Sequence, residues 1–146
     1  MIKIICFGKL KENYLINAVN DYFERANKYH KLSIIELKDS DNIIDEEKEL
    51  LKTIQNDKSY KILLDIKGEE VSSIEFSTLI NDKLTHFSSI TFIIGSSNGV
   101  SENIKNFMNQ KISFGKITMP HGLFRAVLLE QIYRSFKILN NESYHK

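Results

Sequence analysis

The sequence predicts an α/β fold in which helices cover both faces of a mostly parallel sheet. Short, continuously apolar runs alternate along the chain with segments whose apolar residues recur every three or four positions. Runs without an exposed face are typical of strands buried on both sides, as in parallel sheets. With 146 residues, 42% of them hydrophobic, the chain can form a substantial core, and it contains no linker or repeat. We therefore expect one α/β domain over residues 1–146.

The five expected strands are short and rich in β-branched and aromatic residues, and turn-forming residues bound them. The third is expected to end at Lys67-Gly68, and the fourth runs into a glycine- and serine-rich loop. They are Ile2 to Phe7, Leu32 to Leu37, Tyr60 to Ile66, Ile90 to Ile94 and Ile112 to Met119.

The expected helices lie between these strands and carry recognisable start signals. Asp41 can cap the second helix, and Ser101 a short one that reaches about Asn109. Ser72 to Glu75 contains an S-x-x-E capping box at the start of the third. The first helix follows the periodic set Leu15, Ala18, Val19, Tyr22, Phe23 and Ala26, and a long final helix continues past Leu123.

The charge and the cysteine content exclude few classes of function. The net charge is +1, but Lys111 to Lys146 holds six Lys or Arg against two acids, a modest sign of an anionic partner such as nucleic acid. A solvated charge pattern accounts for it equally well. The one cysteine, Cys6, excludes an internal disulfide and fits a reducing compartment. No run resembles a signal peptide or a membrane span, so we expect a cytoplasmic protein.

A ligand site is expected beyond the carboxyl ends of the strands, where open α/β sheets bind their ligands. Three such ends contain glycine, which lets the backbone approach a ligand closely: Leu64 to Gly68, Gly95 to Gly99 and Gly115 to His121. A nucleotide-like ligand is plausible there, although ordinary turn glycines explain the pattern as well.

Several common site classes are unsupported by the sequence. The first strand leads into Gly8-Lys9-Leu10-Lys11 without a dinucleotide-binding fingerprint, and neither a P-loop nor a G-x-S-x-G motif occurs. The four histidines have no metal-ligand spacing, so we expect no metal.

The final helix carries two of the chain's three arginines and is apolar around most of its circumference. Glu130, Arg134 and Lys137 form its polar stripe, whereas Arg125 lies among apolar residues. A buried arginine either forms a structural salt bridge or awaits an anionic ligand. An all-round apolar helix in a small domain also predicts a second subunit, packed against faces that include Leu123, Val127, Ile132 or Phe136.

The C-terminal third resembles the RlmH family, SPOUT-class methyltransferases that act on a pseudouridine in 23S ribosomal RNA. The resemblance covers the whole chain, including the Ile2 to Gly8 start and Leu64-Asp65-x-x-Gly68. Its most specific elements are Gly95-x-x-x-Gly99, Thr118-Met119-Pro120-His121, Arg125, Glu130-Gln131-x-Tyr133-Arg134 and the terminal Tyr144-His145-Lys146.

The resemblance implies a fold, a cofactor and a set of site residues. The fold is an α/β knot with a C-terminal trefoil knot, which no topology rule would suggest. The cofactor is S-adenosylmethionine, the assembly a homodimer, and the reaction methylation of the pseudouridine N3, on the assembled ribosome. The implied cofactor residues are Leu64, Gly95, Phe114, Gly115, Lys116, Ile117, Thr118 and Met119. The implied catalytic and substrate residues are His121, Arg125, Tyr133, Arg134, Tyr144, His145 and Lys146.

The sequence departs from the family pattern at two places, Ser96 in the glycine loop and Ser143 before the terminal Tyr-His-Lys, where the family has glycine and proline. Neither change removes a chemical group. Arg125, Arg134 or Lys146 can favour the ring anion electrostatically, and His121 or His145 can act as base. The alternative functions are a non-enzymatic ribosome- or RNA-binding module and a flavodoxin-like nucleotide sensor.

Overall fold

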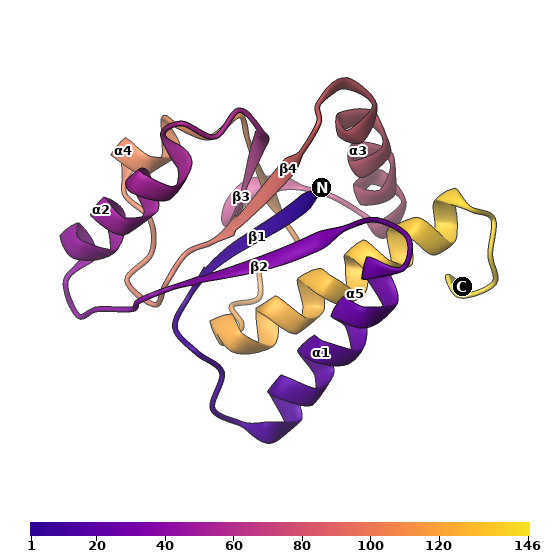
Figure 1. Ribbon diagram of the computed structural model, residues 1–146, viewed down its shortest axis with the longest axis horizontal. Coiled ribbons are helices and arrows are strands. Elements are labelled where there is room, and N and C mark those ends of the chain that lie inside the picture. The colour runs from indigo at the N-terminus through magenta and orange to yellow at the C-terminus, as the bar shows by residue number, and fades with distance from the viewer.

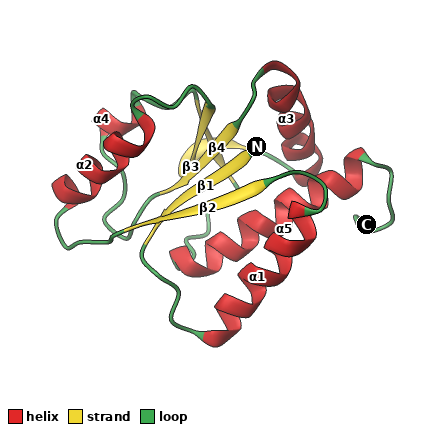
Figure 2. Ribbon diagram, viewed as in Figure 1, coloured by secondary structure: helices red, strands yellow, loops and turns green.

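The computed structural model describes residues 1–146 and alternates strands with helices along the whole chain (Figures 1 and 2). The strands Ile2–Phe7, Leu32–Leu37 and Ile90–Ile94 have the bounds predicted for them. No helix is both long and apolar enough to cross a membrane. In chain order the elements are β1 (Ile2–Phe7), α1 (Asn13–Asn27), β2 (Leu32–Leu37), α2 (Ile43–Ile54), β3 (Tyr60–Glu70), α3 (Ser73–His86), β4 (Ile90–Ile94), α4 (Glu102–Lys105), β5 (Gln110–Ser113) and α5 (His121–Leu139).

The five strands form one sheet in the order β2-β1-β4-β3-β5, and all neighbouring pairs are parallel. The expectation of a mostly parallel sheet is therefore confirmed. β4 lies between β1 and β3, which are earlier in the chain. The carboxyl ends of β4, β3 and β5 are consequently neighbours at one edge of the sheet.

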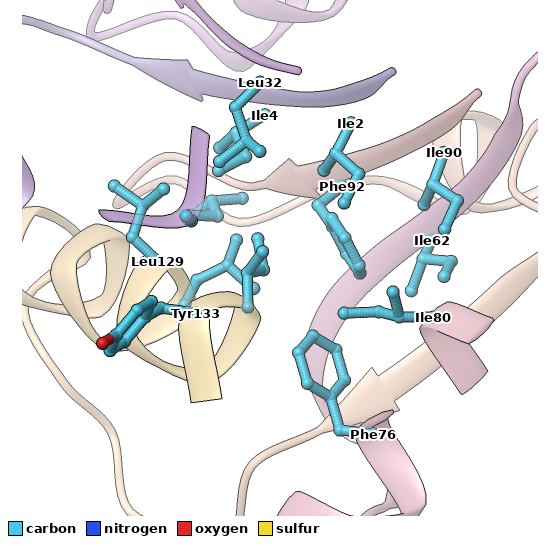
Figure 3. Close-up of a cluster of buried hydrophobic side chains, with 14 of the residues drawn as sticks. Ile2, Ile4, Leu32, Ile62, Phe76, Ile80, Ile90, Phe92, Leu129 and Tyr133 are labelled. Carbon is cyan, nitrogen blue, oxygen red and sulfur yellow. The ribbon is translucent and has the colours of Figure 1, made fainter. Parts of the chain in front are cut away.

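Helices cover both faces, with α1, α3 and α5 on one side and α2 and α4 on the other (Figure 1). Successive side chains of a strand point to opposite faces, so each strand serves two cores. Ile4 and Phe92 belong to the larger cluster, together with residues of α3 and α5 (Figure 3). Ile5 and Ile93 belong to the smaller one, with Leu50 of α2. This double burial explains the continuous apolar runs of the sequence.

Five predicted element bounds are wrong. The second helix is capped by Asn42, whose side chain accepts from the Ile44 amide, and not by Asp41. α4 spans only Glu102–Lys105, so it stops short of Asn109. The other three corrections concern strands: β3 continues past Ile66 to Glu70, and β5 begins at Gln110 and ends at Ser113, rather than at Ile112 and Met119. The capping box at Ser72, by contrast, is confirmed on both of its hydrogen bonds.

The chain leaves the sheet after Ser113 because a turn forms there. The Ser113 hydroxyl donates to the Gly115 carbonyl at 2.8 Å and accepts from the Gly115 amide at 3.1 Å. Gly115 has φ of 127°, a conformation that favours glycine. The apolar residues that follow are used to line a cavity instead of extending the strand.

Helix α5 buries most of its surface within its own chain. Ile132 is fully buried and Phe136 is 7% exposed, with the Phe136 ring stacked on Tyr29 at 5.8 Å. The expectation that these two residues face a second subunit is therefore wrong, because α1, α3 and the sheet already cover them. Leu123, at 41% exposure, and the half-buried Val127 keep an outward face. The trefoil knot implied by the resemblance stays a prediction.

Candidate active site

A cavity of about 590 Å³ opens where the carboxyl ends of β3, β4 and β5 meet the start of α5. Its walls combine backbone-rich loops, apolar side chains and a few charged groups. The residues that line it are Leu63 to Lys67, Ile94 to Ser97, Gly99, Val100, Lys105, Ile112 to Gly115, Ile117 to His121 and Phe124. Seven of the eight residues expected to hold the cofactor are in this lining, and the exposed Lys116 is the exception.

The β3 wall is irregular because β3 changes register against β5. Leu64 and then Glu69 both pair with Ile112, so the residues between them form a bulge. Gly68 permits this approach, since a Cβ there would lie 2.7 Å from the Ile112 nitrogen and the Lys111 carbonyl carbon. The bulge carries Asp65, Ile66 and Lys67 to the cavity.

The loop after β4 forms a tight turn at the second wall. Gly99 has φ of 77°, and its amide donates to the Ser96 carbonyl at 3.0 Å. A Cβ added to Gly95 would meet Val100 Cγ2 at 2.7 Å. The turn therefore presents backbone at the cavity, and Gly95 leaves it room to do so.

The segment between β5 and α5 forms the third wall. Phe114 is held edge-on by Phe76 at 5.2 Å and contacts Phe124 at 5.5 Å. Ile117 is 80% exposed even though it lines the cavity, so an apolar surface faces incoming ligands. Apolar side chains with adjacent backbone groups are typical of small-molecule sites.

Sequence reasoning missed the charged part of the lining. Lys105 Nζ lies 3.5 Å from Asp65 Oδ2 and 3.4 Å from Glu102 Oε1. Asp65, followed by Glu102, raises the pKa of Lys105 above its ordinary value, although burial opposes the shift. Asp65 follows Leu64 directly in the sequence and could have been predicted as a lining residue. Lys105, in contrast, is brought to the cavity only by folding.

His121, the first residue of α5, is the one predicted catalytic residue that lines the cavity. The others lie farther along the same helix or beyond it. Arg134 is thirteen residues after His121, which corresponds to about 20 Å along the helix. Within one chain, the cavity and the tail residues are thus well separated.

Arg125 is 2% exposed and bonds groups of its own chain. Its Nη1 lies 2.7 Å from Glu36 Oε2, and its Nη2 donates to the carbonyls of Phe7 and Gly8 at 3.3 and 3.1 Å. Of the two alternatives, the structural salt bridge is the one observed, and Arg125 joins α5 to the carboxyl ends of β1 and β2. Its Nε is buried without a partner.

The tail folds back onto α5 around Arg134. Arg134 forms a salt bridge to Glu130 at 2.6 Å, its Nη1 lies 3.1 Å from His145 Nδ1, and its guanidinium stacks on the Tyr144 ring at 4.7 Å. Tyr144 donates to Glu130 at 3.0 Å and meets the Tyr133 ring edge-on at 4.9 Å. Burial, assisted by the bond to Glu130, raises the pKa of Tyr144 to about 12. The ordered contacts contradict a frayed tail, although Lys146 itself is exposed.

No group of three or more His, Cys, Asp or Glu side chains is arranged to hold a metal ion.

Comparison with known proteins assigns the chain to a family. The family model described as "Predicted SPOUT methyltransferase" matches residues 1–145. Curated relatives named "Ribosomal RNA large subunit methyltransferase H" are 45% identical in Malacoplasma penetrans, 47% in Fusobacterium nucleatum and 48% in Mycoplasma mycoides. Each alignment covers 99% of both chains.

A solved structure supports the fold independently. The tRNA (m1G37) methyltransferase from Aquifex aeolicus matches with a TM-score of 0.54 at 15% identity, over 91% of this chain and 69% of that one. The family model and the relatives match almost the full length of the chain. The chain belongs to the SPOUT methyltransferases and, within them, to the ribosomal RNA large subunit methyltransferase H family.

Proposed function

We propose that this protein uses S-adenosylmethionine to methylate N3 of a pseudouridine in the 23S RNA of the large ribosomal subunit, in the cytoplasm. The observation that carries the proposal is the cavity, since seven residues expected to hold the cofactor converge on it from three separate segments. Relatives that match almost the full chain are named as methyltransferases of large-subunit ribosomal RNA.

The residues present suit S-adenosylmethionine. The volume of about 590 Å³ lies within the range of small-molecule sites. Leu64, Phe114 and Ile117 offer apolar surface to an adenine ring, and the turns at Gly95 and Gly115 bring backbone groups close. Asp65 and Lys105 supply one charge of each sign for the charged amino-acid end.

When bound, S-adenosylmethionine would supply an electrophilic methyl group for the ring nitrogen, whose proton a base of the chain would take up. The chain contributes a rigid cavity that fixes the reacting groups in line. His121, which lines the cavity, would accept the departing proton. Arg134 and Lys146 would stabilise the ring anion electrostatically.

We propose further that the active form is a homodimer in which the tail of one chain serves the cavity of the other. In one chain, Arg134 lies about 20 Å along α5 from His121, which is too far for both residues to contact the same nucleobase. A partner lying against the outward face of α5, at Leu123 and Val127, would remove that separation.

The substrate is proposed to be the RNA on an assembled ribosome. The elements described form the sheet and its covering helices, so the RNA would be bound by the surface around the cavity. The ribosome would then position the nucleotide.

The test is a methylation assay with isotopically labelled S-adenosylmethionine and three substrates that lack the modification: free 23S RNA, large subunits and whole ribosomes. We expect label in ribosomes at one pseudouridine, and little in free RNA. Isothermal titration with the cofactor accompanies it, since neither an RNA-binding module nor a nucleotide sensor predicts sulfonium-dependent binding. No label on any substrate, despite saturable cofactor binding, would overturn the proposed reaction.

A further inference from the structure

Glu46 is a buried carboxylate with no basic partner. It lies on α2 and is 3% exposed, in contrast to its exposed neighbour Asp45 and to Glu49 farther along the helix. Buried carboxylates are costly unless hydrogen-bond donors compensate for the lost water. The donors around Glu46 therefore indicate what the residue does.

All of these donors come from two loops. Glu46 Oε1 accepts from the Ser96 hydroxyl at 2.5 Å and from the Asn98 side-chain amide at 3.0 Å. Glu46 Oε2 accepts from the Ser40 amide at 3.0 Å. Asn98 also donates to the Ser40 carbonyl at 2.8 Å, so both loops meet on one carboxylate.

These contacts reach the cavity without Glu46 entering it. Ser96 and Gly99 line the cavity, whereas Glu46 is behind the turn that they form. The Ser96 hydroxyl, while donating to Glu46, accepts from the Asn98 amide at 3.1 Å, and the Ser96 carbonyl accepts from the Gly99 amide. Glu46 thus holds both side chains that organise the turn.

The charge on Glu46 is favoured in the folded protein. Burial alone would raise its pKa, but the bonds from Ser96, Asn98 and Ser40, with a Coulombic contribution from His121, lower the pKa below its ordinary value. An ionised carboxylate forms the stronger hydrogen bonds.

We propose that Glu46 is a positioning residue that fixes the Gly95–Gly99 turn in the shape that accepts the cofactor. At position 96, where the family pattern has glycine, this chain has a serine, and Glu46 accepts a hydrogen bond from its hydroxyl. A turn ordered beforehand loses less conformational freedom when a ligand binds. The inference rests on the proposed function only for the identity of the ligand.

The experiment has one measurement that needs no ligand and one that does. Amide hydrogen exchange of the free protein is followed at Asn98 and Gly99, with Ile90–Ile94 as an internal reference. Isothermal titration then measures the dissociation constant of S-adenosylmethionine. The variants are Glu46→Ala, Glu46→Gln and Ser96→Ala, and Glu49→Ala is the matched control, because Glu49 lies on the same helix and pairs only with exposed groups.

We expect Glu46→Ala to accelerate exchange at Asn98 and Gly99, leave Ile90–Ile94 protected, and weaken cofactor binding about 10-fold or more. The effects of Glu46→Gln should be intermediate. The glutamine oxygen can still accept from Ser96 and Asn98, but the glutamine NH2 group would face the Ser40 N–H, which is also a donor. Adding Ser96→Ala to Glu46→Ala should change affinity little, since both remove the same bond. At saturating cofactor, turnover should stay near the wild-type rate, which separates positioning from catalysis.

The outcomes are separable. If wild-type protein binds no S-adenosylmethionine, the proposed function fails, and the exchange measurement still decides the role of Glu46. Unchanged exchange at Gly99 in Glu46→Ala overturns the proposal. Should that variant not fold, the same result in Glu46→Gln and Ser96→Ala overturns it. Equal losses in Glu46→Ala and Glu49→Ala would also contradict it.

Discussion

Arg125 and Glu36 are 89 positions apart in the sequence, and their side chains form a 2.7 Å salt bridge between α5 and β2. The guanidinium is buried, whereas the Glu36 side chain is 37% exposed. Arg125 also binds the carbonyls of Phe7 and Gly8, which fixes the end of β1. The pair holds together the two strands farthest from the cavity and the helix that carries His121.

We therefore predict that Arg125→Lys acts first on stability. A lysine keeps the charge but cannot form the planar fork that reaches Glu36 and both carbonyls. The free energy of unfolding should fall by about 1–3 kcal/mol, the cost of leaving buried carbonyls without a donor, because the partly exposed Glu36 adds little. Urea denaturation measures it, with Arg25→Lys as control, since the Arg25–Asp21 pair is exposed. A loss of turnover at full stability would instead place Arg125 on the substrate.

Gly95→Val should weaken cofactor binding, because the new side chain fills the space that the ligand needs beside the turn. Its Cβ would also meet Val100 Cγ2 at 2.7 Å, so the companion variant Gly95→Val/Val100→Ala relieves that clash. We expect both to bind S-adenosylmethionine about 10-fold or more weakly in titration. Val100→Ala alone is the control. Normal affinity in the folded double variant would mean that the ligand does not approach Gly95.

Removal of Tyr144 to Lys146 should leave folding and cofactor binding largely intact and abolish methylation. The deleted residues contact Arg134, Glu130 and Tyr133, none of which lines the cavity. Arg134→Lys should likewise lower turnover, because lysine cannot keep the two N–H bonds that Arg134 donates to Glu130 Oε1. The checks are thermal unfolding, titration and the ribosome assay. Normal turnover without the tail would refute the assignment of these residues.

At a cofactor concentration too low for Gly95→Val to bind it, mixing two variants that are inactive alone should restore activity if the tail of one chain serves the cavity of the other. A tail-deleted chain contributes an intact cavity, and a Gly95→Val chain contributes an intact tail. Random pairing gives half heterodimers with one working site each, so activity should recover to about a quarter of the wild-type value. Each variant mixed with itself is the control. No recovery after co-refolding would show that the tail acts within its own chain.

Stability below neutral pH should depend on Glu46. Its pKa is lowered in the folded protein, so its contribution is complete above the unfolded value of 4.5 and is lost as pH falls below that through the folded pKa. Between about pH 6 and pH 3, wild-type protein should therefore lose more stability than Glu46→Gln. Urea midpoints across this range measure the difference. Parallel curves for the two proteins would contradict the role of this carboxylate.

The parts of the structure that could be predicted depend on residues close together in the sequence, and the parts that could not depend on contacts between distant residues. The bounds of β1, β2 and β4 follow from short apolar runs between turn residues, and the start of α3 follows from Ser72 and Glu75. The strand-end rule also located most of the cavity lining.

The misses depend on contacts that only the folded chain makes. β5 ends early because Ser113 and Gly115 form a turn, although the apolar run continues. The β3 bulge depends on Gly68 lying against β5, and the partner of Arg125 is 89 residues away. In the sequence Glu46 is one of several neighbouring acids, and only the folded chain brings it into contact with Ser96 and Asn98.

The position of β4 between β1 and β3 also determines when the molecule can assemble during synthesis. β3 pairs only with β4 and β5. A nascent chain that stops at Glu70 can therefore pair β1 with β2, but its β3 has no neighbouring strand. Pairings between distant segments form late. The two parts of the sheet join once Ile90–Ile94 is made, and the cavity closes only when His121 has followed. Cofactor binding thus requires synthesis at least as far as Phe124, and shorter products of translation have no complete site for the cofactor.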